Sequence, residues 1–304
     1  MLRLTKTTLR LHLCTPFFLL ICGVCFLLGI VTQTELTVYA SEETGVSFEP
    51  VPYYFSLILI AALTAFNISA EFAEGTVRSK LVMGYKKTQL FAAQLISALA
   101  QSIICFAFVT AGVFIMGYRY YFSRFSADLL VMSFGLILLS FVCMAVICTV
   151  ISGLIHHRAL SILLCGGACI GMIFMSSGLR EKLVRPEYRI VSYSENDYVV
   201  DQRTEKSELY VSGVQRDIMK AGYYMTPPSS LLISEKLLNR FNEIYTAADL
   251  EKYREQFKED IYQWDYDFSC ESRIELWRYP LWSGGAVILL TVIGVLIFKK
   301  RDIS

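Results

Sequence analysis

The chain has 304 residues, of which 55% are apolar and only 18% are Asp, Glu, Lys or Arg. An average soluble domain is about a quarter charged, so this composition argues against a soluble fold of this length. It also excludes a disordered chain, a collagen-like fibre and a small disulfide-stapled protein. The net charge of +1 provides no overall field for nucleic acid, and we expect no nucleic-acid partner. The remaining class is an integral membrane protein in contact with a lipid bilayer.

Charged residues are absent from six long stretches of the sequence. Each stretch supplies the roughly 20 residues that a helix needs to cross about 30 Å of hydrocarbon. The first stretch follows three basic residues, as in a signal peptide, but no small-x-small cleavage site closes it promptly, so we expect a retained span. The sequence predicts an all-α polytopic membrane protein with six transmembrane helices, within 11–34, 51–70, 88–118, 129–157, 159–179 and 279–298.

Lysine and arginine in the short loops predict which side of the membrane each loop faces. With the N-terminus inside, eleven of the thirteen basic residues outside segment 180–278 fall in cytoplasmic segments. We therefore expect both termini in the cytoplasm and a multi-pass protein of the cell membrane. The cytoplasmic set is Arg3, Lys6, Arg10, Arg78, Lys80, Lys86, Lys87, Arg158, Lys299, Lys300 and Arg301.

Segment 180–278 has a soluble composition, with 15 basic and 19 acidic residues and a net charge of −4. Its part 188–212 carries short β-prone runs broken by Ser, Asn and Asp. Residues 229–245 have the apolar spacing of an amphipathic helix, and a second helix is expected to begin at Thr246. We therefore expect an α+β extracytoplasmic domain between helices five and six. The predicted organisation is helices one to five in 1–179, the outer domain in 180–278, and helix six with a short tail in 279–304.

The cysteine and histidine patterns do not indicate catalysis or metal binding. Eight of the nine cysteines lie in or beside the spans, where a thiol behaves as a small apolar residue, and Cys270 is the ninth. Cys22-x-x-Cys25 has redox or metal spacing but lies inside an apolar span without a charged neighbour. Adjacent His156 and His157 point about 100° apart on a helix, which disfavours chelation. We expect no metal site, no catalytic residue and no enzyme activity of this chain's own.

The most informative polar stretch is the predicted cytoplasmic loop 71–87, which contains a coupling-helix candidate. Two carboxylates end the second span, a Gly-Thr pair follows, and a short amphipathic run leads to a second glycine and a basic pair. As a helix, this run presents an apolar face to a partner, while Arg78 and Lys80 face water. The apolar face consists of Phe72, Val77, Leu81 and Val82. The alternative is a solvated, positively charged loop.

This loop resembles the coupling segment of permease subunits of type-2 ABC transporters, most of which are exporters. The resemblance implies a bacterial plasma membrane. In that family an acidic residue, Glu-Gly-Thr, a short helix with basic residues, a Gly turn and a basic residue occur in this order. Residues 297–303 also resemble the family's usual ending, and the family's N-terminal interfacial helix is confined here to about 1–13. The expected coupling residues are Glu71, Glu74, Gly75, Thr76, Arg78, Lys80, Gly84, Lys86 and Lys87.

The resemblance implies a mechanism for the chain. Permeases of this class work as pairs, identical or different, and each pair binds two cytoplasmic ABC ATPase subunits that push on the coupling helix. This chain lacks a Gly-x-x-x-x-Gly-Lys-Ser/Thr sequence, so ATP and Mg are expected on the partner ATPase and no cofactor on this chain. The outer domain is larger than the short re-entrant helices of the simplest members. The substrate class therefore stays open among lipid, antimicrobial peptide, drug and polysaccharide.

Polar residues in the third span share one helix face. Gln94, Ser97 and Gln101 recur at helical spacing, and polar side chains in a membrane avoid lipid. This face is expected to line the translocation path or the interface between permeases. Packing between helices of one subunit is an equally good interpretation.

Two other functions are open to the sequence. A non-transporting receptor or sensor would bind a ligand through the outer domain, but it needs no coupling helix, so loop 71–87 discriminates between the two. The spacing of Glu74 and Arg78 also resembles part of the motif of intramembrane glutamate proteases. Position 73 is Ala rather than the second Glu of that motif, which argues against a protease.

Overall fold

The computed structural model describes most of the membrane-spanning part of the chain and about half of the segment between the last two spans. The described residues are 2–39, 48–124, 127–155, 157–184, 188–195, 198–206, 210–240 and 278–300. The expected helix after Thr246 and residue Cys270 lie outside these ranges, as does His156. Residues 241–245, the end of the helix predicted over 229–245, lie outside them as well.

Six helices are long and apolar enough to cross a membrane, which confirms the predicted number of spans. A separate helix, α1 (Leu2–Leu13), precedes the first span, and the short α4 (Thr76–Val82) lies between the second and the third. The break between α1 and the first span falls at Cys14 and Thr15. Pro16 follows directly and is suited to the first turn of a helix. The spans are carried by α2 (Pro16–Tyr39), α3 (Val51–Ala73), α5 (Lys87–Arg124), α6 (Ala127–Leu154), α7 (Arg158–Val184) and α12 (Arg278–Lys300).

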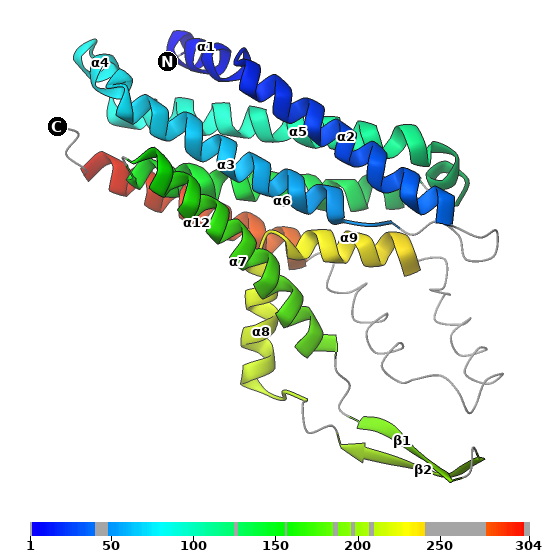
Figure 1. Cartoon of the computed structure of the whole chain (residues 1–304). Coiled ribbons are helices and arrows are strands. Elements are labelled where there is room, and N and C mark those ends of the chain that lie inside the picture. The colour runs from blue at the N-terminus through cyan, green and yellow to red at the C-terminus, as the bar shows by residue number, and fades with distance from the viewer. Residues whose placement is uncertain are drawn as a thin grey trace.

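The spans pack into one bundle in which α3, α5 and α6 occupy the centre. Helix α2 packs along α5, α3 contacts α5, α6 and α7, and α12 packs against α6. Buried aromatic rings, among them Tyr53 and Phe141, form part of the core between these helices. Helices α1 and α4 and the C-terminal end of α12 lie at the same end of the bundle (Figure 1). That end therefore collects the segments that the sequence places on one side of the membrane.

Helices α2 and α5 approach each other closely enough to touch through their backbones. A Cβ atom placed on Gly29 would lie 2.5 Å from the Val109 carbonyl oxygen. One placed on Gly112 would collide with the Phe26 carbonyl oxygen. Small residues allow this close approach, which is a common way for helices to associate in lipid.

The described part of 180–278 contains a hairpin and two helices. Strands β1 (Tyr188–Glu195) and β2 (Tyr198–Lys206) pair antiparallel, with an irregularity after Tyr193. Helices α8 (Val214–Met225) and α9 (Ser229–Arg240) follow. No separate α+β domain is seen among the described residues, so that domain stays a prediction.

Helix α9 lies along the span α6 instead of within a separate outer domain, contrary to the prediction for 229–245 (Figure 1). The Ser234 hydroxyl donates a hydrogen bond of 3.0 Å to the Ser133 carbonyl, and the Ser140 hydroxyl donates one of 2.8 Å to the Pro227 carbonyl. Pro227 lies beside Ser140 near the middle of α6, and Ser234 lies beside Ser133, nearer the start of α6. Helix α9 therefore runs antiparallel to α6. Helices α8 and α9 thus form a hairpin that packs on the bundle.

The tip of this helical hairpin is held by one side chain at the start of α12. The Tyr279 hydroxyl lies 3.0 Å from the Thr226 carbonyl and 3.1 Å from the Pro227 carbonyl. It accepts hydrogen bonds from the Ser230 amide at 3.1 Å and the Ser229 hydroxyl at 3.2 Å. Tyr279 is fully buried, so these contacts satisfy polar groups of a turn that is closed off from solvent.

Candidate functional site

The connection between the second and third spans is a short helix bracketed by two glycines. Gly75 has φ 70° and Gly84 has φ 90°, and both values lie in the left-handed region that side chains disfavour. Gly75 reverses the chain after α3 and precedes α4, while Gly84 lies in the turn before α5. The glycines at these two positions of the predicted coupling segment are therefore required by the backbone.

One face of α4 packs against the bundle. Val77 is buried in a small cluster formed with residues of α1, α5 and α12, whereas Phe72 and Leu81 are partly buried against the same cluster. The prediction that Val77 offers a contact to a partner is therefore wrong. The buried members of the cluster are Leu4, Val77, Leu90, Phe91, Ala93 and Phe298.

The exposed apolar surface of this connection is its C-terminal tip. Val82 is 83% exposed and Met83 is 69% exposed, as expected for Val82. Arg78 and Lys86 are also exposed, so the tip is an apolar pair flanked by positive charge. Exposed large apolar side chains beside cations fit two kinds of contact, with a partner protein or with a membrane surface.

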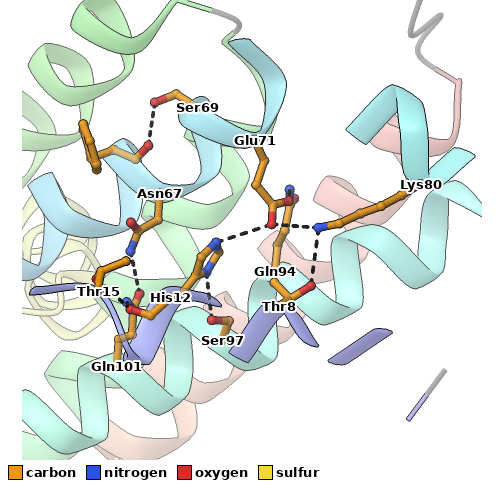
Figure 2. Close-up of polar contacts among 11 residues, drawn as sticks. Thr8, His12, Thr15, Asn67, Ser69, Glu71, Lys80, Gln94, Ser97 and Gln101 are labelled. Atoms are coloured by element: carbon orange, nitrogen blue, oxygen red, sulfur yellow. Dashed lines mark hydrogen bonds and ion pairs between the residues drawn. The ribbon is translucent and has the colours of Figure 1, made fainter. Parts of the chain in front are cut away.

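The last turn of α4, which contains Lys80, is anchored by a buried ion pair (Figure 2). Lys80 was expected to face water, but its ammonium Nζ lies 2.8 Å from Oε1 of Glu71, which is only 3% exposed. The Gln94 amide donates a hydrogen bond of 2.9 Å to the other carboxylate oxygen of Glu71. The expectation for Lys80 is wrong because the turn at Gly75 folds α4 back toward the end of α3, where Glu71 lies.

Helix α1 reaches the same carboxylate. His12 Nε2 lies 3.4 Å from Glu71 Oε1, and His12 Nδ1 lies 2.9 Å from the Ser97 hydroxyl. Lys80 Nζ lies 3.5 Å from the Thr8 hydroxyl of the same helix. Figure 2 shows these side chains converging on Glu71 from four helices, α1, α3, α4 and α5. We call Thr8, His12, Glu71, Lys80, Gln94 and Ser97 the Glu71 cluster.

Gln94, Ser97 and Gln101 do share one buried face of α5. Gln101 extends the polar contacts beyond the Glu71 cluster: its amide donates to the His12 carbonyl at 3.2 Å and accepts from the Asn67 amide at 3.3 Å. The partners in these contacts lie on α1 and α3 among the described residues, which agrees with packing between helices of one subunit. Their predicted place at a permease interface or along a path stays a prediction.

Glu74 forms an ion pair within the chain. Its carboxylate lies 2.5 Å from the guanidinium nitrogen Nη2 of Arg158, the first residue of α7. No side chain caps α4 at Gly75. The Arg158 guanidinium also lies over the Phe66 ring, 5.9 Å from its centre. Both members of this ion pair are solvent-exposed, so it contributes about 0 to 1 kcal/mol to stability.

Sequence reasoning missed the contributions of His12, Thr8 and Asn67. Thr8 and His12 share a buried face of α1 with Leu4, and Asn67 is buried on α3, but the sequence names no partner for any of them. Among the described residues, no group of three or more His, Cys, Asp or Glu is placed to hold a metal ion. The Cys22 and Cys105 sulfurs lie 4.0 Å apart and both thiols are free.

In comparisons with known proteins, no family model and no curated protein sequence matches this chain. The family that the loop resembles therefore stays a prediction.

Proposed function

We propose that this chain is a membrane-spanning permease subunit of an ATP-driven ABC transporter, most simply an exporter. It works as a pair, with a second permease subunit and with separate cytoplasmic ATPase subunits that bind ATP and Mg. In this proposal the end of the bundle that carries α1 and α4 faces the cytoplasm of the cell. Segment 180–278 lies on the outer side, where it contributes an extracytoplasmic domain.

One observation carries the proposal: the short helix between the second and third spans is anchored to the bundle and has an exposed apolar tip. The tip, Val82 and Met83, is available to a partner, whereas Lys80 ties the same helix to the end of α3 through Glu71. A force applied at the tip is therefore transmitted to α1, α3 and α5 together. An ATPase that closes on binding ATP supplies such a force. A receptor that only binds a ligand on the outer side needs no such anchored helix.

The proposal is tested on a complex of this chain with an ABC ATPase that co-purifies with it from the native membrane. The variant Met83→Glu places a charge in the proposed contact, and Ser212→Glu adds the same charge at an exposed site far from α4 in the sequence. We expect Met83→Glu to weaken ATPase binding about tenfold or more, since burying such a side chain contributes about 1.5–3 kcal/mol. Ser212→Glu should leave binding unchanged.

Two results contradict the proposal. One is the absence of any complex between the wild-type chain and such an ATPase. The other is a complex whose affinity and transport are unaffected by Met83→Glu, because the loop would then be only a solvated connector.

A further inference from the structure

Helix α1 has two faces with different chemistry. Thr8 and His12 follow Leu4 at intervals of four residues, and all three side chains are buried against the bundle. The basic residues Arg3, Lys6 and Arg10 are all exposed and fall within an arc of about 60° at about 100° per residue. The centres of the two faces lie nearly opposite each other on the helix.

The basic face is unused within the described part of the chain. None of its three cations, Arg3, Lys6 and Arg10, forms an ion pair with any residue that the structure describes. Its neighbour Leu11 is 53% exposed, although it is a large apolar side chain. Basic and apolar side chains exposed side by side are typical of a helix that lies at a membrane surface.

The position of α1 puts this face at the depth of lipid headgroups. The first membrane-spanning segment begins at Pro16, immediately after the helix. Helix α1 also lies at the same end of the bundle as the close of α12, whose last residues are Lys299 and Lys300 (Figure 1). The cations of α1 are thus close to a membrane–water boundary, where anionic headgroups attract Lys and Arg.

We propose that the face formed by Arg3, Lys6 and Arg10 binds the headgroup of an anionic phospholipid. Arginine donates paired hydrogen bonds to phosphate oxygens, and lysine adds a compact charge. The exposed Leu11 contacts the beginning of the acyl chains. A single lipid, or two neighbouring ones, satisfies cations that have no partner within the described chain.

Bound lipid would also bear on the coupling helix, because the buried face of α1 contacts it. Thr8 lies beside Lys80, and His12 lies beside Glu71, so a shift of α1 changes the anchor of α4. This consequence rests on the proposed function. Lipid binding itself does not, and it is measured without an ATPase or a transport assay.

The test uses the full chain in nanodiscs of phosphatidylcholine with a minor fraction of phosphatidylglycerol. A photoreactive amino acid replaces Thr7, which is exposed next to Lys6 on α1. Mass spectrometry then gives the ratio of the two lipids among the crosslinked adducts. We expect phosphatidylglycerol to be enriched several-fold over its fraction in the nanodisc, and the enrichment to fall at high salt because screening weakens exposed charge interactions.

Two charge-removal variants make the result specific to α1. Lys6→Gln/Arg10→Gln should bring the adduct ratio close to that of the nanodisc. Lys299→Gln/Lys300→Gln removes two exposed cations at the same end of the bundle and should retain most of the enrichment. Thermal unfolding of each variant shows whether it is folded.

Three results overturn the proposal. The first is a wild-type adduct ratio equal to that of the nanodisc, and the second is an equal loss of enrichment in both double variants. The third is crosslinking of Thr7 mainly to a protein chain, which would make this face a protein interface. A failure of the ATPase experiment with intact lipid enrichment would refute the transport function alone.

Discussion

Glu71 and Lys80 form a buried ion pair whose cost of desolvation is offset by neighbouring polar groups. Gln94 donates to the carboxylate at 2.9 Å, and Thr8 lies 3.5 Å from the ammonium. Such pairs contribute little to stability as a whole, but removing one partner leaves a buried charge without compensation. The pair therefore fixes where α4 lies more than it stabilises the fold.

Replacement of Lys80 by Met should strongly destabilise the protein. The change leaves Glu71 buried without its cation, and breaking a buried pair costs about 3–5 kcal/mol. The double variant Glu71→Gln/Lys80→Met removes both charges and should recover much of the loss. Thermal unfolding in nanodiscs measures both effects. The matched control is Glu74→Gln in the exposed pair with Arg158, which should shift the midpoint little.

Equal, small effects of Lys80→Met and Glu74→Gln would contradict the buried pair. Hydrogen exchange of α4 adds a local measurement, because loss of the anchor should speed exchange in α4 before the rest of the bundle is affected.

The Glu71 cluster was only partly accessible to sequence reasoning. The positions of Glu71, Gly75 and Lys80 were all singled out, but Lys80 was expected in water. A lysine in a short polar loop is normally exposed, and its burial depends on the chain reversal at Gly75. The role of His12 depends on contact between segments that are almost 60 residues apart. No local pattern in the sequence indicates such a contact.

Among the helices, the closest contact is the crossing of α2 and α5. Gly29 and Gly112 meet there through backbone atoms, while Gly23 of α2 has nothing within 4 Å of an added Cβ. The same substitution should therefore have opposite consequences at two glycines of one helix.

We expect Gly29→Ala to destabilise the protein and Gly23→Ala to leave it unchanged or slightly more stable. The added methyl group of Gly29→Ala forces the two helices apart, and overpacking typically costs about 1–3 kcal/mol. At Gly23 the methyl group faces open space, and alanine is the better helix former. Thermal unfolding of the two variants in the same nanodiscs gives the comparison. Identical shifts for both would mean that α2 and α5 do not cross at Gly29.

The hairpin of α8 and α9 depends on the hydroxyl of Tyr279. Tyr279→Phe removes one hydrogen-bond partner of the turn, while the Thr226 and Pro227 carbonyls keep other donors, so the expected cost is about 0.5–1.5 kcal/mol. We expect faster hydrogen exchange around Ser230, with little change in α2 and α5. Tyr85→Phe is the control, because the hydroxyl of Tyr85 makes no hydrogen bond within the described residues. Unchanged exchange at the turn would show that Tyr279 does not hold it.

The spans themselves were predictable because long uncharged stretches have few structural alternatives. The location of α9 was not, since its apolar spacing fits both a soluble domain and the side of a membrane bundle. The structure shows how the serines of α9 are accommodated against α6. The hydroxyls of Ser230 and Ser234 donate hydrogen bonds to backbone carbonyls, so neither is left unpaired. Serine in a helix can always bond to its own backbone, so the sequence alone does not separate the two environments.

For the whole molecule, the distribution of Lys and Arg predicts which end faces the cytoplasm. A cysteine replacing Lys86 should be protected from a membrane-impermeant thiol reagent in intact cells, whereas one replacing Ser212 should react. Both positions are exposed, so burial does not explain a difference between them. The background carries Cys14→Ser and Cys270→Ser, which removes the exposed Cys14 and the outer-segment cysteine. Reaction at position 86 and protection at 212 would invert the topology.

The most direct test of the central claim is a crosslink from the tip of the coupling helix. A photoreactive amino acid at Met83 should crosslink to an ABC ATPase that co-purifies with this chain, in the assembled complex within a membrane. The same amino acid at Thr7, at the same end of the bundle, should give mainly lipid adducts. If Met83 crosslinks only to lipid or to this chain while the complex with the ATPase is intact, the tip of α4 is not the docking segment, and the account of this protein as a transport subunit loses its principal support.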